Sequence, residues 1–310
     1  MQKISSARNR RAFTLIEVMV AAAITIVMVG LVIQITGEVL KLWNRSMGKL
    51  SANAEARMAM ELLTSDLEMA VLVNNGQQWL RVETNVTDSP IVGQTVALKL
   101  FTTAMDRQAN QAGNISAVSY RLAEAPAYDG AKEDSFVLFR ALEEPRETFD
   151  TLLGSTADGS KQQELMGGFW DETNTVNPAN YLAGNIVDFK VYLYGDVIPS
   201  GETQKVEVIF NASGDVEVEG DDLSYTRSDD FDGSVSQNYV YGGIDSSQLL
   251  PTFAEISLTI MSDEGLEILR LLSQGIEGTG FENSQEGVND VILQHGEVFK
   301  RRVHFKAKPF

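Results

Sequence analysis

Few side chains in this 310-residue sequence could carry out catalysis. The chain has no cysteine and two histidines, His295 and His304, so disulfides, thiolate metal sites and a cysteine nucleophile are excluded. Neither histidine lies in a recognisable nucleophile motif, although a Ser-His-Asp arrangement can assemble from distant positions. We therefore predict that the protein is not an enzyme, and we predict no catalytic residue and no cofactor.

The densest run of acidic side chains lies between residues 215 and 232 and could hold a cation. Calcium takes about six to eight oxygen ligands, and the candidate ligands are Asp221, Asp222, Asp229, Asp230 and Asp232. The EF-hand pattern fails here, because Ser228 and Tyr239 stand where it needs acidic residues. A solvated acidic loop is the default interpretation, with a calcium site as the alternative.

Glu17 is the only charged residue in the apolar stretch 13–35, FTLIEVMVAAAITIVMVGLVIQI. An ionisable group within lipid is costly and usually marks a function or a partner. The simpler alternative is that its carboxylate reaches the headgroups at the membrane interface. Glu17 is therefore a candidate functional residue whose meaning depends on its surroundings.

The stretch around Glu17 has the length of a membrane-spanning helix. A helix over residues 13–35 would measure about 35 Å, against about 30 Å for a bilayer core. Arg8, Arg10 and Arg11 precede it, which favours a cytoplasmic N-terminus. A cleavable signal peptide, whose apolar part is shorter, and a buried core helix are weaker alternatives.

Charge is divided unevenly along the chain. Residues 1–37 carry a net charge of +3. The whole chain carries −18, so residues 38–310 carry −21. Such an acidic chain argues against a phosphate-binding surface, which needs clustered cations. We expect no nucleic-acid partner.

Residues 10–18, RRAFTLIEV, resemble the signal of type IV pilins and type II secretion pseudopilins. The resemblance implies that a prepilin peptidase cuts between Ala12 and Phe13 on the cytoplasmic side and methylates the new amino group of Phe13. It also implies that Glu17 pairs with the amino terminus of a neighbouring subunit. The family normally has glycine before the cut, where this chain has Ala12.

Beyond the span, apolar residues recur at steps of mostly three and four as far as Leu67. This spacing predicts one helix from about residue 13 to 73, ended by Asn74-Asn75-Gly76, with its second half against a globular domain. The alternation of apolar and polar residues then predicts strands at 96–101, 115–122, 135–142, 187–194, 205–210, 216–219, 254–261 and 298–306, with a hairpin at 211–214. A short helix is expected at 263–273, before a loop at 275–290.

These elements predict an α+β fold in which a long N-terminal transmembrane-to-periplasmic helix packs on antiparallel β-sheets. The expected divisions are a leader at 1–12, the transmembrane half of the helix at 13–37, its exported half at 38–75 and a β-rich globular domain at 76–310. Loop aromatics are predicted to be mostly core, and any that are exposed would be docking candidates: Trp79, Phe169, Trp170, Tyr239 and Tyr241. The run Lys300-Arg301-Arg302 is interpreted as a solvated strand face or a contact with an acidic neighbour.

The globular part resembles the J-type minor pseudopilin of type II secretion. The resemblance rests on an ordered series of short motifs: Arg57-Met58, Ser65-Asp66-Leu67, residues 118–122, 137–140, 187–192 and 250–256. The segments 143–180 and 220–250 and the tail after 261 depart from a minimal chain of that type. They fit a pseudopilin that works outside standard type II secretion.

The resemblance implies a minor pseudopilin that assembles with other minor and major prepilins into a short periplasmic pseudopilus, initiating or capping it for protein secretion across the outer membrane. Its other implied partners are the prepilin peptidase, the inner-membrane assembly platform and membrane lipid. The implied location is a single pass through the inner membrane with a periplasmic C-terminal domain. Two alternatives stay open: a minor pilin of a surface type IV pilus for adhesion, motility or DNA uptake, and a non-polymerising anchored binding protein.

Overall fold

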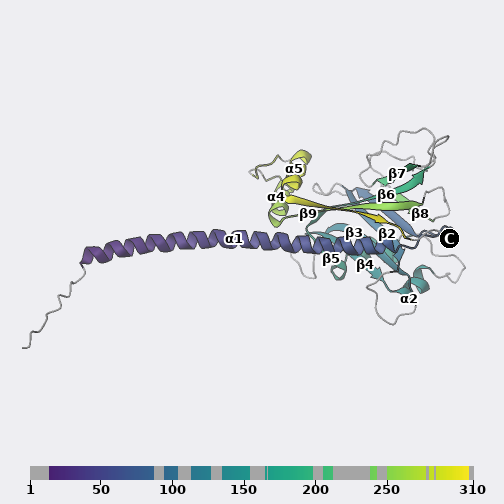
Figure 1. The fold of residues 1–310 in the computed structure, drawn as a ribbon, viewed down its shortest axis with the longest axis horizontal. Helices are drawn as coiled ribbons and strands as arrows, with labels where there is room; N and C mark the ends of the chain where they lie inside the picture. Colours follow the sequence, from purple (N-terminus) through teal and green to yellow (C-terminus); the bar gives the residue numbers. More distant parts are fainter. Residues whose placement is uncertain are drawn as a thin grey trace, which may run out of the picture. The chain divides into compact units, whose positions relative to one another are not determined.

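A computed structural model describes most of the chain and divides it into two compact units, Met1–Gly48 and Lys49–Phe310, each considered by itself below. The residues it describes are 14–86, 94–103, 113–126, 135–153, 165, 167–197, 205–211, 238–242, 250–276, 279–282 and 284–306. Figure 1 labels the helices and strands.

The helix α1, Leu15–Glu68, begins in the first unit and ends in the second. It contains no proline, which would remove a backbone hydrogen bond in the helix interior. The expected end near residue 73 is wrong. The chain leaves the helix earlier because Ala70 forms a bridge with Thr102, and the Val71 N–H donates to the Phe101 carbonyl at 2.8 Å.

The larger sheet has six strands in the order β5-β4-β3-β2-β1-β8, and every neighbouring pair is antiparallel. Its strands are β1 Leu80–Val86, β2 Gln94–Thr102, β3 Ser116–Ala125, β4 Ser135–Glu143, β5 Tyr181–Gly184 and β8 Asn238–Tyr241. Three of these, β1, β5 and β8, were not expected from the sequence.

The second sheet has four antiparallel strands in the order β10-β9-β6-β7. They are β6 Ile186–Val197, β7 Lys205–Asn211, β9 Pro251–Met261 and β10 Gly296–His304. The expected strand 216–219 lies outside the described residues. So do residues 212–214 of the expected hairpin 211–214. The prediction of antiparallel sheets beside a long helix is confirmed, so the fold class is α+β.

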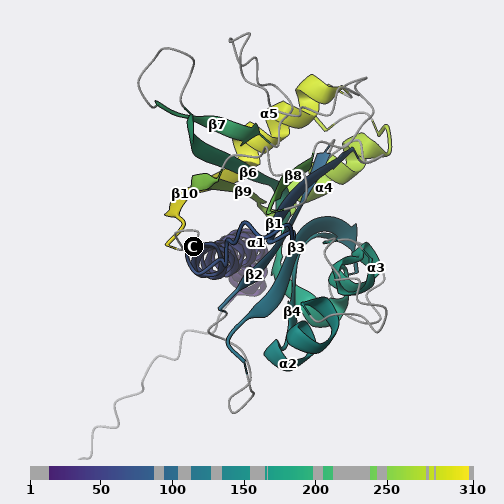
Figure 2. The same cartoon turned by 90° about the vertical axis from the view of Figure 1, so that its right-hand side faces the viewer.

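The core of the second unit lies between α1 and the inner faces of both sheets (Figure 2). The helix contributes Ala52, Ala56, Ala59, Leu63 and Leu67, spaced three or four residues apart. Alanine at three of these positions lets the strands approach the helix closely. Truncating the fully buried Leu63 to alanine would cost about 2–5 kcal/mol.

Short elements cover the outer face of the six-stranded sheet. They are α2 Pro145–Glu147, η1 Thr148–Leu152, η2 Gly168–Trp170, α3 Glu172–Thr175 and η3 Pro178–Asn180. Beneath them Lys99 pairs with Glu83 at 2.9 Å, and Phe101 packs edge-to-face on Trp79 and Trp170. Burial lowers the pKa of Lys99, although the Glu83 carboxylate opposes this. This layer explains how charged residues such as Lys99 and Glu83 are buried on the outer face of the six-stranded sheet.

Two helices follow β9. The helix α4, Asp263–Ser273, has the predicted bounds, and the Ser262 hydroxyl caps it by accepting from the Gly265 N–H. The loop expected at 275–290 is wrong at its end, because α5, Gln285–His295, begins within it under a cap from Ser284. His295 is the last residue of α5.

Candidate functional site

The N-terminus of α1 carries a reciprocal pair of hydrogen bonds between Thr14 and Glu17. The Glu17 carboxylate accepts from the Thr14 N–H at 2.9 Å and from its hydroxyl at 3.0 Å through Oε2. In return, the Glu17 N–H donates to Thr14 Oγ1 at 3.3 Å. This is a capping box, in which residues three apart satisfy two backbone donors that the helix leaves unpaired.

The cap gives Glu17 a second role that the sequence reasoning missed, although the spacing Thr-x-x-Glu is its signal. In the described part of the chain, the other carboxylate oxygen, Oε1, accepts no hydrogen bond. One carboxylate oxygen therefore caps the helix end, and the other is not part of the cap.

The helix that follows is apolar on every side. Its Leu15–Trp43 portion has a mean hydropathy of 2.6 and is the one helix among the described residues that is long and apolar enough to cross a membrane. Its large apolar side chains are exposed, Leu15 at 81% and Ile26 at 72% among them. Exposed apolar surface is unfavourable in water, so this portion is consistent with a single-pass membrane anchor.

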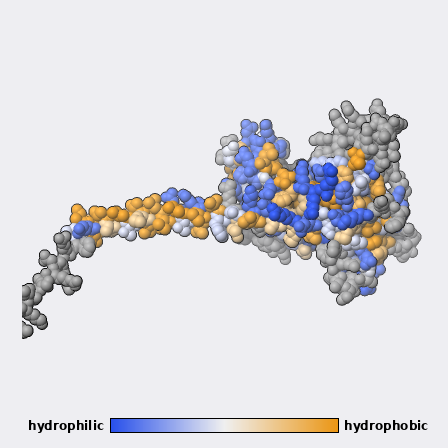
Figure 3. All heavy atoms as spheres, viewed as in Figure 1, coloured by the Kyte–Doolittle hydropathy of each residue, from blue (hydrophilic) through white to orange (hydrophobic). Residues whose placement is uncertain are grey.

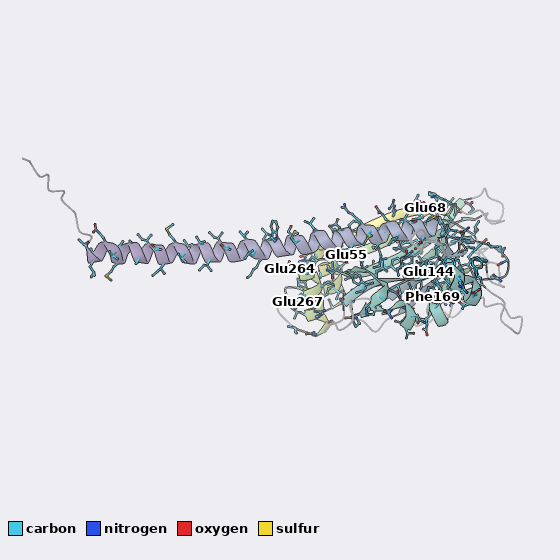
Figure 4. All side chains as sticks on the ribbon, turned by 90° about the horizontal axis from the view of Figure 1, so that it is seen from below. Glu55, Glu68, Glu144, Phe169, Glu264 and Glu267 are labelled. Carbon is cyan, nitrogen blue, oxygen red and sulfur yellow. The ribbon has the colours of Figure 1, made fainter. Side chains whose placement is uncertain are left out.

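Polar contacts fasten the Lys49–Glu68 part of α1 to the strands. The Glu55 carboxylate accepts from the Tyr181 hydroxyl at 2.8 Å and from the Gly184 N–H at 3.2 Å. Burial, followed by the hydrogen bond and charge of Glu55, raises the pKa of Tyr181 to about 12. Figure 4 shows Glu55 and Glu68 well apart along this part of α1, and Glu68 pairs with Lys306 beyond the end of β10 at 2.5 Å.

The deepest of these contacts joins Asp66 to Tyr120 and Arg140. Asp66 is 2% exposed, and its Oδ2 atom lies 3.0 Å from an Arg140 guanidinium nitrogen. The Asp66 carbonyl also accepts from the Thr102 hydroxyl at 2.8 Å. The three elements α1, β3 and β4 therefore meet at one buried carboxylate. Asp66 was part of a motif noted in the sequence, but its contact with Tyr120 and Arg140 was not expected.

Other residues singled out from the sequence are placed unequally. Ala12 and Phe13 lie outside the described residues, as do the calcium candidates Asp221, Asp222, Asp229, Asp230 and Asp232. Among the described residues, no group of three or more histidine and acidic side chains could share a metal ion. Neither His295 nor His304 is hydrogen-bonded through its ring to a serine or an aspartate within that same part of the chain.

The loop aromatics lie where a core would place them. The side chains of Trp79, Trp170, Tyr239 and Tyr241 are buried, and Phe169 is half-buried against Trp170 with ring centroids 4.9 Å apart. The prediction that most of them belong to the core is confirmed. They are therefore poor candidates for docking other subunits.

The N-terminal residues match a known family model. Residues 7–33 match the model of a family described as "Prokaryotic N-terminal methylation motif". This chain carries a prokaryotic N-terminal methylation motif. The matched residues include the capping box and about two thirds of the apolar portion, so Thr14 and Glu17 are both part of the motif.

Comparisons over the whole chain add little. No curated protein matches it. Among solved structures, the chain is similar to the type IV-like pilin TTHA1219 from Thermus thermophilus, with 9% identity and a TM-score of 0.28 over 82% of this chain and 95% of that one. The methylation motif is therefore the feature on which a functional assignment depends.

Proposed function

We propose that this protein is a pilin-like subunit that is processed at the methylation motif and works by assembling with related subunits. One observation carries the proposal: the motif at residues 7–33 runs directly into a helix whose far end is built into the core of an α+β unit. A single continuous helix can hold the chain in a membrane and pass from there into a folded unit without a linker.

In this proposal, a prepilin peptidase removes residues 1–12 and methylates the amino group of Phe13. The chain then spans the inner membrane once, with its N-terminus cytoplasmic and the β-rich unit on the periplasmic side. Assembly brings the apolar helix out of lipid and against the helices of other prepilins through an inner-membrane assembly platform. The exposed apolar surface of Leu15–Trp43 supports such packing.

The capping box supports a defined role for Glu17. A carboxylate in an apolar bundle is stabilised by a cation that reaches it. Cleavage before Phe13 creates an amine, and Glu17 Oε1 accepts no bond within the described residues. We infer that the amine of a neighbouring subunit binds this oxygen while Oε2 keeps the helix capped.

The finer assignment within this proposal is a J-like minor pseudopilin, which initiates or caps a short periplasmic pseudopilus for secretion across the outer membrane. It rests on the ordered motifs between residues 57 and 261. Three of its residues, Asp66, Tyr120 and Arg140, form the buried contact between helix and sheet. The motif series therefore includes residues that fasten the helix to the fold.

Mass spectrometry of the mature chain, isolated from membranes of a host with a prepilin peptidase, tests the proposal. We expect a first residue of N-methylated Phe13, and the unprocessed chain in a host without the peptidase. A chain that keeps Met1 when the peptidase is present, or one that starts beyond residue 35, would overturn it.

A further inference from the structure

The outer face of the four-stranded sheet carries a basic surface in an acidic chain. In the register of the sheet, Lys300 on β10 and Lys190 on β6 both lie opposite Ser257 of β9. Two residues along β10, Arg302 lies opposite Glu255, and His304 lies opposite Phe253. Side chains two apart in a strand share a face, so we call these four residues, Lys190, Lys300, Arg302 and His304, the basic face.

The opposite face of the same strand is core. Ala254, Ile256 and Leu258, which alternate with Phe253, Glu255 and Ser257 along β9, are fully buried against α1 and the other sheet. Lys300, Arg302 and His304 are exposed. Figure 3 shows hydrophilic side chains gathered over the β9 region of this sheet. The basic face is therefore a surface, unlike the covered outer face of the six-stranded sheet.

An aromatic stack supports the basic face. Phe253 lies parallel to Tyr194 with ring centroids 4.4 Å apart, and the Arg302 guanidinium carbon lies 4.5 Å from the centre of the Phe253 ring. The His304 ring centroid lies 5.5 Å from that of Phe253. A guanidinium held against an aromatic ring loses less freedom when it binds a carboxylate.

The cations of the basic face are only partly neutralised. Lys190 pairs with Asp188 at 3.0 Å, whereas Arg302 reaches Glu255 at 3.7 Å, a loose and solvated pair. Within the described part of the chain, Lys300 has no acidic side chain in ion-pair range. The surface therefore retains positive charge that another acidic group could use.

Protection of a sheet edge explains part of this pattern. Lysine and arginine on edge strands discourage unwanted strand pairing, and β10 is an edge strand. However, Lys190 and Tyr194 lie on β6, which has a strand on each side. Edge protection requires neither a cation there nor an aromatic stack, so the basic face has features that suit binding.

We propose that the basic face binds the acidic segment 212–237 of a second copy of this chain. That segment holds eight acidic residues and one basic residue, Arg227, for a net charge of −7. Because the basic face and the acidic segment consist of different residues of one chain, their pairing between copies is heterologous and can repeat from subunit to subunit. The proposal rests on the proposed function only in that copies must meet in one membrane.

A charge-swap experiment with the full chain in detergent micelles tests this. The face-reversed variant is Lys300→Glu/Arg302→Glu, and the segment-reversed variant is Asp229→Lys/Asp230→Lys. Differently tagged copies are mixed in pairs, and the association constant is measured by sedimentation. The matched control, Lys49→Glu/Arg146→Glu, changes the same charge at two exposed positions elsewhere, and near-ultraviolet circular dichroism verifies that each variant is folded.

We expect each reversed variant, mixed with itself, to associate about tenfold or more weakly than the wild type, since several exposed ion pairs are lost. The mixture of the two reversed variants should recover association, because each reversed surface then meets its opposite charge. Wild-type association should weaken as salt rises from about 0.1 to about 1 M, where the screening length falls from about 10 to about 3 Å. The control should match the wild type.

Three results would overturn the proposal. The first is that the face-reversed variant, mixed with itself, associates as strongly as the wild type. The second is that the mixture of the two reversed variants does not recover association. The third is that the basic face contacts segment 212–237 only within single chains. If the face-reversed variant does not fold, the segment-reversed variant and the salt dependence decide. The N-terminal mass is measured on the same chains after processing, so normal processing without recovery would leave the proposed function standing and this inference rejected.

Discussion

The Tyr120 hydroxyl on β3 donates a hydrogen bond of 2.5 Å to Oδ2 of Asp66, in the last turn of α1. Arg140 Nε on β4 donates to the same oxygen at 3.0 Å and to the Tyr120 hydroxyl at 2.9 Å. Burial and the charge of Asp66 raise the pKa of Tyr120 well above its usual value, although Arg140 opposes this. The phenol therefore remains a donor at any physiological pH, and the contact holds the end of the helix to the sheet.

We expect Asp66→Ala to destabilise the fold by about 3–5 kcal/mol, because it leaves the Arg140 guanidinium buried without this carboxylate. Denaturant unfolding of the full chain in detergent micelles measures this. The control is Glu267→Ala, which removes an exposed pair with Arg270 at 3.8 Å and should cost less than about 1 kcal/mol. Equal losses for the two variants would mean that the buried contact adds nothing beyond a surface pair.

Alkaline pH should weaken the attachment at Tyr181. Its pKa is about 12 in the folded state and 10.0 when unperturbed, so the unfolded chain loses this proton first and stability falls as pH rises from 10 toward 12. Tyr181→Phe removes the titrating group, so its stability should fall less steeply over that range. Denaturant midpoints of the wild type and of Tyr181→Phe, measured at about pH 9, 10, 11 and 12, give the slope of stability against pH for each chain. Identical slopes would contradict the prediction.

Gly242→Ala should be destabilising for two separable reasons. Gly242 has a φ of 90°, and an added Cβ would lie 2.4 Å from the Gln77 carbonyl oxygen. Gly280 has a similar φ of 85° with nothing within 4 Å of the same atom, so Gly280→Ala isolates the conformational cost. We expect Gly242→Ala to cost about 1–3 kcal/mol more than Gly280→Ala in thermal unfolding. Equal costs would show that the backbone around Gln77 yields.

The parts of the fold that were predictable are those whose pattern is local. Strand β9 alternates because Ala254, Ile256 and Leu258 face the core, and that alternation is visible in the sequence. Strand β1 was missed because Arg81 and Glu83 look like solvent-facing residues, yet both are buried, and Lys99, which pairs with Glu83, donates to the carbonyl of the distant Leu165. Strands β5 and β8 have four residues each and exist through partners distant in the chain.

The candidate site divides in the same way. Phe13 and Glu17 belong to one short motif, so the sequence alone could single them out. The contact among Asp66, Tyr120 and Arg140 spans separations of 54 and 74 residues, and no spacing rule connects them before the sheet forms. The early end of α1 has the same cause, since Ala70 pairs with Thr102 on a distant strand.

Glu17→Ala should leave processing and membrane insertion intact and impair assembly. The change removes the carboxylate that would bind the amine of a neighbouring Phe13, as well as the cap that it gives to the Thr14 N–H. The loss of a cap alone is worth about 1 kcal/mol, so Thr14→Ala, which removes the hydroxyl and keeps the carboxylate, estimates the cap's share. Glu38→Ala, another exposed acidic residue of α1, is the matched control.

The measurement is co-purification of the tagged chain with prepilins expressed beside it, together with the N-terminal mass of each variant. We expect all three variants to begin at Phe13, and Glu38→Ala to co-purify like the wild type. Thr14→Ala should lose less co-purification than Glu17→Ala, because an uncapped helix end still presents the carboxylate to a neighbour's amine. If Thr14→Ala and Glu17→Ala lose the same amount, the carboxylate acts through the cap alone, and no contact with a neighbouring amine is required.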